Sequence, residues 1–199
     1  MAVSAKQFDQ LVKRVSGKTS KADDTSQTSA SRKHQIILGV DPSLRGTGFG
    51  VIHQIGEQAE MLGHGTIKCP PSWKVSRCLA HIHDLLREAI MKHQPTACAI
   101  EGLFYAQNYR TALVMGEARG AALVAAASFG LDIFELAPRK VKQAIVGYGN
   151  AQKIAVAKMV QRMLRLDEVP QADAADALAL ALAFSQESRR RIGTMPKQI

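Results

Sequence analysis

Residues 36–52, IILGVDPSLRGTGFGVI, constrain the possible folds more than any other stretch of the chain. The opening apolar run has the β-branched composition of a buried strand, and it ends on Asp41. Because Pro42 has no N–H group and cannot extend a ladder, we expect Asp41 to lie at the end of a strand. The stretch alone is equally compatible with an ordinary Asp-Pro turn, so the rest of the chain has to decide.

A second strand follows this turn, and three glycines punctuate it. They are Gly46, Gly48 and Gly50. Their missing side chains leave room for another backbone or a ligand to approach closely. We therefore expect the hairpin to form a floor for something bulky and anionic.

The chain has 199 residues, of which 46% are hydrophobic, which is enough for one well-filled core and too few for two large domains. We expect a disordered basic extension over 1–34, one α/β domain over 35–186 and a basic C-terminal tail over 187–199. The formal net charge is +9, to which the extension contributes +4 and the tail +3. Basic tails favour contact with polyanions such as nucleic acid, although only +2 remains for the domain.

The cysteines argue for a reducing compartment. There are three, widely spaced and without a CxxC pair, which argues against a disulfide framework or a zinc site. No apolar run approaches the roughly 20 residues that span a bilayer, and no secretory signal is recognisable. The sequence therefore predicts a soluble, cytoplasmic protein.

Periodicity and turn residues predict the remaining elements. Strands are expected at 59–68, 96–101 and 131–136, and helices at 73–93, 111–128 and 171–184. A basic segment over 138–164 is expected to form two short helices interrupted by glycines. The loop after strand 96–101 is rich in aromatic residues, among them Phe104, which either stack on bases or return to the core.

Four carboxylates occur where the predicted fold brings them together. Asp41 and Glu101 each end an apolar strand, while Asp173 and Asp176 lie three residues apart on one face of the last helix. Acids near a helix N-terminus also complement its dipole, which is the simpler account of the helical pair. However, both are embedded among alanines that let the helix approach a sheet, where unpaired carboxylates are costly without a cation.

Convergent carboxylates of this kind are typical ligands of Mg²⁺ or Mn²⁺. Two such ions activate a water and stabilise the leaving oxygen of a phosphoryl displacement, so we expect metal-dependent phosphodiester hydrolysis. The residue patterns that zinc hydrolysis, acyl transfer and ATP hydrolysis require are absent from the sequence. His81 and His83 are two residues apart and cannot share a helix face, and the chain has no HExxH, GxSxG or Walker A motif.

From Ile36 to about Ser185 the chain resembles the bacterial RuvC family of Holliday-junction resolvases. The resemblance rests on GVDPSLRGTGFGVI, AIEGLFYAQN, GEARGAALVAA, RKVKQAIVGYGNAQK and above all QADAADALA. It implies a ribonuclease-H-like fold, in which helices flank a mixed five-stranded sheet. It also implies a homodimer that nicks two opposed strands of a four-way DNA junction and cooperates with a branch-migration helicase complex.

The same resemblance implies roles for individual residues. Two Mg²⁺ ions per subunit, which Mn²⁺ can replace, are expected to bind the four carboxylates Asp41, Glu101, Asp173 and Asp176. Lys153 is expected to act in catalysis. The expected DNA contacts are Phe104, Arg139, Lys140 and Lys142.

Two positions depart from the family pattern. Ser43 stands where a Gly usually follows Asp-Pro, and this bears on the geometry of the turn. Gly102 stands where a Gln is common after the catalytic Glu, which leaves open how Glu101 is held.

Other interpretations stay open at this stage. A junction-binding protein without cleavage is expected to lack a carboxylate, and all four are present. GVDPSLRGTG also resembles the first phosphate loop of sugar-kinase and actin-like ATPases, which need a second loop and another domain. A related nuclease that acts on RNA–DNA hybrids or other branched nucleic acid remains an alternative. The small residues of helix 111–128, including Gly120, predict close contact within the chain or with a second subunit.

Overall fold

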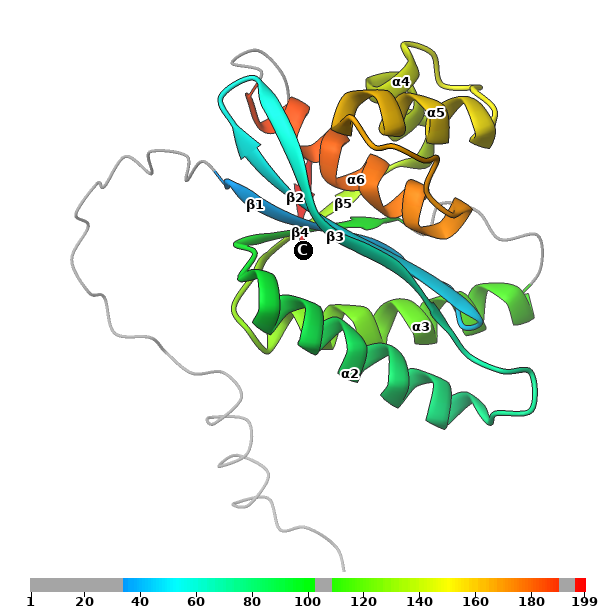
Figure 1. Ribbon diagram of the computed structural model, residues 1–199. Coiled ribbons are helices and arrows are strands. Elements are labelled where there is room, and N and C mark those ends of the chain that lie inside the picture. The colour runs from blue at the N-terminus through cyan, green and yellow to red at the C-terminus, as the bar shows by residue number, and fades with distance from the viewer. Residues whose placement is uncertain (1–33, 103–108, 190–195) are drawn as a thin grey trace, which may run out of the picture. The chain divides into compact units, whose positions relative to one another are not determined.

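The computed structural model describes residues 34–102, 109–189 and 196–199. They form a six-stranded mixed sheet with the strand order β3-β2-β1-β4-β5-β6 (Figure 1). The strands are β1 (Ile36–Asp41), β2 (Gly46–Ile55), β3 (Gln58–Lys68), β4 (Ala97–Glu101), β5 (Asp132–Leu136) and β6 (Lys197–Gln198). β1, β4 and β5 run parallel, whereas β2, β3 and β6 pair antiparallel with their neighbours.

Helices cover both faces of the sheet. One face carries α2 (Val75–His93) and α3 (Tyr109–Ala127), and the other carries α4 (Pro138–Val146), α5 (Lys153–Leu164) and α6 (Ala172–Arg189) (Figure 1). Alternating strand residues fill the two layers, so that on β1 Ile37 packs on the α6 side and Leu38 on the α2–α3 side. Within the described ranges, no helix is both long and apolar enough to cross a membrane.

The predicted mixed α/β architecture is confirmed, although the sheet has six strands rather than five. The additional strand, β6, is two residues long and pairs with β5. Two polar residues carry no alternation, so the sequence gives no signal for this strand. Both ends of the predicted C-terminal tail 187–199 belong to the fold. α6 continues to Arg189, and Lys197–Gln198 form β6. Residues 1–33, which hold nearly all of the expected disordered extension, lie outside the described ranges.

The predicted interruption between α4 and α5 is confirmed. Gly147 ends α4 in the left-handed region, with φ of 97°, and its N–H donates to the carbonyl oxygen of Gln143. Residues with a Cβ atom rarely adopt this conformation, which is why a glycine ends the helix. α5 then begins at Lys153, which places this lysine at a helix N-terminus.

Between Ala177 and Phe184, α6 is apolar on all sides and buried. It lies so close to β1 and β2 that side chains on the facing strand positions would collide with its backbone. A Cβ atom on Gly39 would lie 1.9 Å from the carbonyl oxygen of Ala177, and one on Gly48 would lie 1.9 Å from that of Asp173. Gly48 on β2 therefore makes room for a backbone, as predicted, and so does Gly39 on β1, whereas Gly46 leaves room for the side chain of Asp173. The expectation that they form a floor for an anionic ligand is wrong, because α6 takes this place.

Replacing Gly39 by Ala tests this packing. The added methyl group collides with the α6 backbone, and overpacking of a well-packed core costs about 1–3 kcal/mol. We expect chemical denaturation to show a free energy of unfolding lowered by about this amount or more. Gly120→Ala in α3 is the matched control, since a Cβ there meets no atom within 4 Å and raises helix propensity. Equal stability of the two variants would contradict the close contact.

Candidate active site

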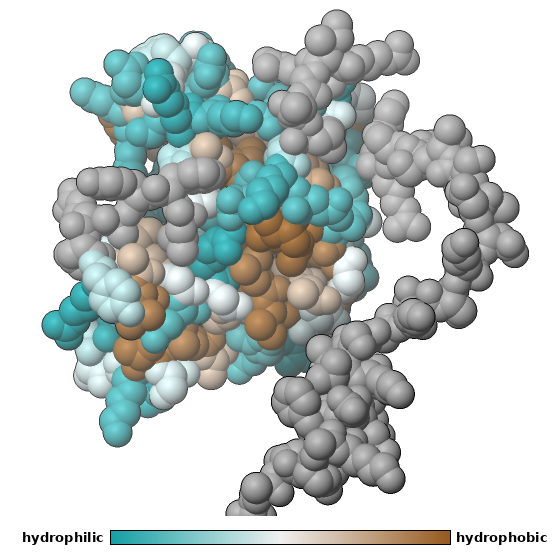
Figure 2. Space-filling model, turned by 180° about the vertical axis from the view of Figure 1, so that it is seen from behind, coloured by the Kyte–Doolittle hydropathy of each residue, from teal (hydrophilic) through white to brown (hydrophobic). Residues whose placement is uncertain are grey.

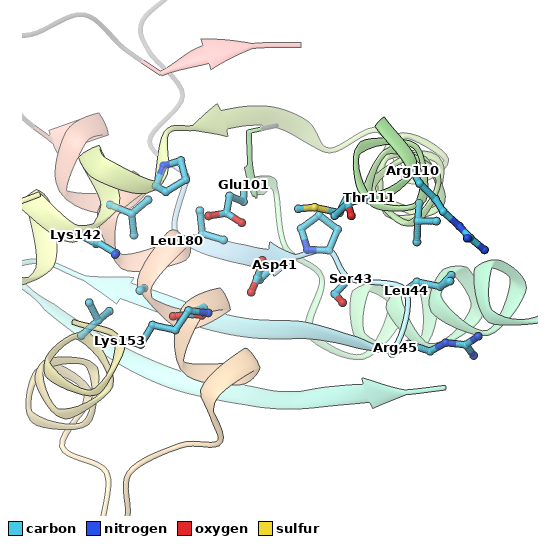
Figure 3. A pocket seen from close by; sticks show the side chains of 18 residues that line it. Asp41, Ser43, Leu44, Arg45, Glu101, Arg110, Thr111, Lys142, Lys153 and Leu180 are labelled. Carbon is cyan, nitrogen blue, oxygen red and sulfur yellow. The ribbon is translucent and has the colours of Figure 1, made fainter. Parts of the chain in front are cut away.

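Asp41 and Glu101 lie together at the carboxyl ends of parallel strands. Val40 is opposite Ile100 in the register of β1 and β4, so the residues that follow end the two strands at the same level. Val40 and Ile100 pack in the α2–α3 layer, and alternation therefore turns Asp41 and Glu101 toward α6. Figure 3 shows both carboxylates at one cavity, which has a volume of about 760 Å³.

α6 brings a third carboxylate, that of Asp176, to the same cavity. Its Oδ2 atom lies 2.7 Å from Nζ of Lys153. Asp173, one turn earlier, is not among the cavity's lining residues. Its carboxylate faces β2, where a Cβ atom on Gly46 would lie 2.9 Å from Oδ2 of Asp173. The cavity thus collects three of the four predicted carboxylates, and the fourth lies beside it on the same helix.

The carboxylates crowd one another. Burial raises the pKa of Asp41 to about 8, and the charge of Glu101, a hydrogen bond with Glu101 and the charge of Asp176 add to the shift. Lys153 acts in the opposite direction. The pKa of Lys153 is raised, chiefly by its hydrogen bond to Asp176, while burial opposes this shift. At neutral pH the Asp41–Glu101 pair therefore holds a proton, in the place where a cation would relieve the same repulsion.

The chemistry of these donors fits a hard divalent cation, because all of them are carboxylate oxygens. Among the described residues, however, no three Asp, Glu, His or Cys side chains are already arranged to hold a metal ion. Asp176 is engaged with Lys153, and Asp173 faces β2. Lys153 contacts only Oδ2 of Asp176, so a cation bound by Asp176 would share this carboxylate with the lysine.

Two of the predicted cationic residues line the cavity, Lys142 from α4 and Lys153 from α5. Arg139 and Lys140 do not line it. Both are exposed, and the side chain of Arg139 lies against Gly149, where a Cβ would be 2.4 Å from Cγ of the arginine. Phe104, the predicted aromatic contact, lies outside the described residues.

The cavity also contains cations that the sequence reasoning missed. Arg45 and Arg110 line it on the side opposite Lys142 and Lys153 (Figure 3). Arg45 stands four residues after Asp41, but the pattern of residues 42–46 predicts only a turn.

Arg45 ties this turn to the loop that precedes α2. Its Nη1 donates to the carbonyl oxygens of Pro70 at 2.6 Å and Trp73 at 3.2 Å. The turn that follows Asp41 is therefore held by a neighbouring loop as well as by its own strand.

Comparison with known proteins agrees with this arrangement. Residues 37–184 match the family model described as crossover junction endodeoxyribonuclease RuvC. The RuvC of Pasteurella multocida is 51% identical over 150 residues, which are 75% of this chain and 78% of the relative. The RuvC of Myxococcus xanthus is 46% identical over 158 residues, which are 78% of this chain and 83% of the relative.

Solved structures give the same result. T. thermophilus RuvC in complex with a Holliday junction substrate has a TM-score of 0.77 and 33% identity, and the match covers 83% of this chain and 100% of that one. The yeast mitochondrial Holliday junction resolvase Ydc2 has a TM-score of 0.55 at 12% identity over 75% of this chain and 78% of that one, which is a likeness of fold alone. The predicted ribonuclease-H-like fold is confirmed. The chain belongs to the RuvC family of crossover junction endodeoxyribonucleases.

Proposed function

We propose that this chain is a Holliday-junction resolvase, a metal-dependent endonuclease that makes paired nicks in four-way DNA junctions during recombination and repair. The observation that carries the proposal is the cavity at the ends of β1 and β4, where Asp41, Glu101 and Asp176 lie with Lys142 and Lys153. Acids that attract metal ions and cations that attract phosphate meet there. The neighbour from T. thermophilus, solved with a Holliday junction substrate, supports this choice of DNA.

The proposed metal ligands are Asp41, Glu101, Asp173 and Asp176, and the proposed ions are two Mg²⁺ per subunit, which Mn²⁺ replaces. When bound, the ions supply the activation of a water and the stabilisation of the leaving oxygen. The carboxylates contribute the negative charge that retains the ions. Asp173 is one turn from Asp176 on α6, so it reaches the same end of the sheet from the β2 side.

The two lysines have the complementary role. Lys153 is protonated at neutral pH, and its hydrogen bond to Asp176 raises its pKa further above the ordinary value. Its ammonium group is therefore available to stabilise negative charge on the scissile phosphate. Lys142 binds the DNA backbone at the same end of the cavity. The exposed Arg139 and Lys140 contact the DNA outside the cavity. Phe104, which lies outside the described residues, is the proposed aromatic contact with the junction.

Activity on three substrates tests the proposal. A synthetic four-way junction, a linear duplex and an RNA–DNA hybrid of matched sequence are incubated with the protein and Mg²⁺. We expect symmetric nicks in the junction and much slower cleavage of the other two. Faster cleavage of the hybrid would favour a related nuclease of the same fold, and binding without cleavage would favour a junction-binding protein.

We also propose a homodimer, since two opposed nicks need two sites and a two-fold axis supplies them. The outer face of α3 supports this assembly. Tyr109, Leu113 and Val124 on this face are 83%, 51% and 57% exposed, and the space around Gly120 is open. Figure 2 shows apolar surface on the lower half of the molecule, the side on which α2 and α3 lie in Figure 1. We propose that the dimer works in the cytoplasm with a branch-migration helicase complex.

Replacement of Asp176 by Asn tests the metal site. The change keeps the shape of the side chain and removes its charge. Loss of residues that merely support metal ligands costs about 10–100-fold, so we expect loss of a ligand to lower the single-turnover nicking rate by at least about a hundredfold. Junction binding in EDTA should be retained. Asp167→Asn, at an exposed acid outside the cavity, should leave both unchanged. Nicking by Asp176→Asn at the wild-type rate would place the catalytic centre elsewhere.

The raised pKa of Asp41 predicts how the stability of the metal-free protein depends on pH. Because this pKa is about 8 in the folded protein and 3.8 ordinarily, the folded state binds more protons than the unfolded state between these values. The contribution of Asp41 to stability in EDTA should therefore fall as the pH rises from 4 to 8. The difference between wild type and Asp41→Asn, measured by denaturation across this range, isolates the contribution of Asp41. A difference that does not vary with pH would contradict the shift.

Replacement of Gly120 by Leu tests the dimer. A bulky side chain on the outer face of α3 should weaken self-association while the fold remains intact, because a Cβ atom on Gly120 meets no neighbouring element among the described residues. Sedimentation equilibrium measures the effect as a dissociation constant raised about tenfold or more, which corresponds to about 1.4 kcal/mol. Ala80→Leu adds similar bulk to an exposed position of α2 and should leave association unchanged. A wild-type dissociation constant for Gly120→Leu would exclude this face.

A further inference from the structure

The backbone of Glu101 is held by α3, which covers the face of the sheet opposite α6 (Figure 1). Arg119, on α3, donates from Nε to the carbonyl oxygen of Glu101 at 3.3 Å. Its Nη2 donates to the carboxylate of Glu135 on β5. The side chains of Arg119 and Glu135 are only 14% and 20% exposed. The arginine of a largely buried ion pair therefore also donates a hydrogen bond to the last residue of β4.

The residue that follows β1 explains why this bond is needed. The N–H of Gly102 donates to the carbonyl oxygen of Leu136 on β5, at 3.0 Å. In a trans peptide the carbonyl group points away from the N–H group, so the oxygen of Glu101 points toward β1. With Val40 opposite Ile100, the ladder donor at this level is residue 42, and Pro42 has no N–H group.

Arg119 supplies the donor that Pro42 lacks. A buried carbonyl group without a donor costs about 1–3 kcal/mol and leaves the peptide free to tilt. Glu135 faces α3 from the neighbouring strand, and its carboxylate fixes where the guanidinium lies. The fork of the guanidinium reaches both partners at once, which a lysine ammonium on a flexible stem does not do.

We propose that Arg119 is a positioning residue for the carboxylate of Glu101. By fixing the peptide of Glu101 on the α3 side, it fixes the direction in which the side chain leaves the strand toward Asp41 on the α6 side. Glu135 positions Arg119 in turn. The proposal rests on the proposed role of Glu101 as a metal ligand, and it answers how Glu101 is held when a glycine follows it.

Two variants distinguish a role of Arg119 in positioning Glu101 from a role in stabilising the packing of α3. Arg119→Lys keeps a positive charge for Glu135 and loses the bond from Nε to Glu101. The double variant Arg119→Met/Glu135→Leu replaces the pair by apolar side chains of similar size, a change that often preserves or raises stability. Arg189→Gln is the control, because it breaks the exposed ion pair between Arg189 and Glu57, far along α6.

Three quantities are measured on each protein without DNA. They are the melting temperature, the dissociation constant for Mn²⁺ by calorimetry and the exchange rate of the Gly102 amide hydrogen by NMR. We expect Arg119→Lys to weaken Mn²⁺ binding by about 10–100-fold and to speed Gly102 exchange by about tenfold or more, with the same direction in the double variant. Arg189→Gln should change neither.

Wild-type Mn²⁺ affinity and Gly102 exchange in a stably folded Arg119→Lys protein would overturn the proposal. If the double variant fails to fold, Arg119→Lys alone decides. Glu101→Gln distinguishes the proposed ligand role of Glu101 from the proposed positioning role of Arg119. If it leaves Mn²⁺ affinity unchanged, the proposed ligand role of Glu101 is wrong, while the Gly102 exchange rate still reports on the positioning. If it weakens Mn²⁺ binding and the Arg119 variants do not, only the positioning role is wrong.

Discussion

The contact between α6 and the glycines of β1 and β2 is the constraint on which the site depends. Without Cβ atoms at Gly39 and Gly48, the backbone of the helix lies directly against the strands. This is how Asp176 reaches the level of Asp41, which is fixed by the end of a buried strand. A larger residue at either glycine would move the helix, and with it one carboxylate, away from the other two.

The same contact concentrates negative charge among partly buried side chains. Asp41 takes up a proton and Asp176 pairs with Lys153, and both responses lower the cost of that crowding. A site that must attract divalent cations is therefore one that destabilises the metal-free fold at high pH. Natural proteins accept such local conflicts at functional positions and offset them elsewhere, here in a core filled on both faces of the sheet.

Much of this arrangement could be predicted from local patterns, and the rest depends on register and rotation. Apolar runs that end on Asp41 and Glu101 locate two strand ends, and helical spacing puts Asp173 and Asp176 on one face. Three residues at 3.6 per turn still separate the two acids by about 60° around the axis, enough for one to face β2 and the other Lys153. Spacing alone does not choose between these directions. β6 was missed because two polar residues have no periodicity.

Arg119 shows what a single sequence hides. It stands among small residues in GEARGAALVAA, and nothing local identifies Glu135 or the carbonyl group of Glu101 as its partners. Its neighbour Gly120 lies on the outer face of the same helix. One turn of α3 therefore contacts the last peptide of β4 and presents the surface proposed for a second subunit. Substitution effects at neighbouring residues need not be additive, so association and metal affinity are best measured on the same variants of these two adjacent positions.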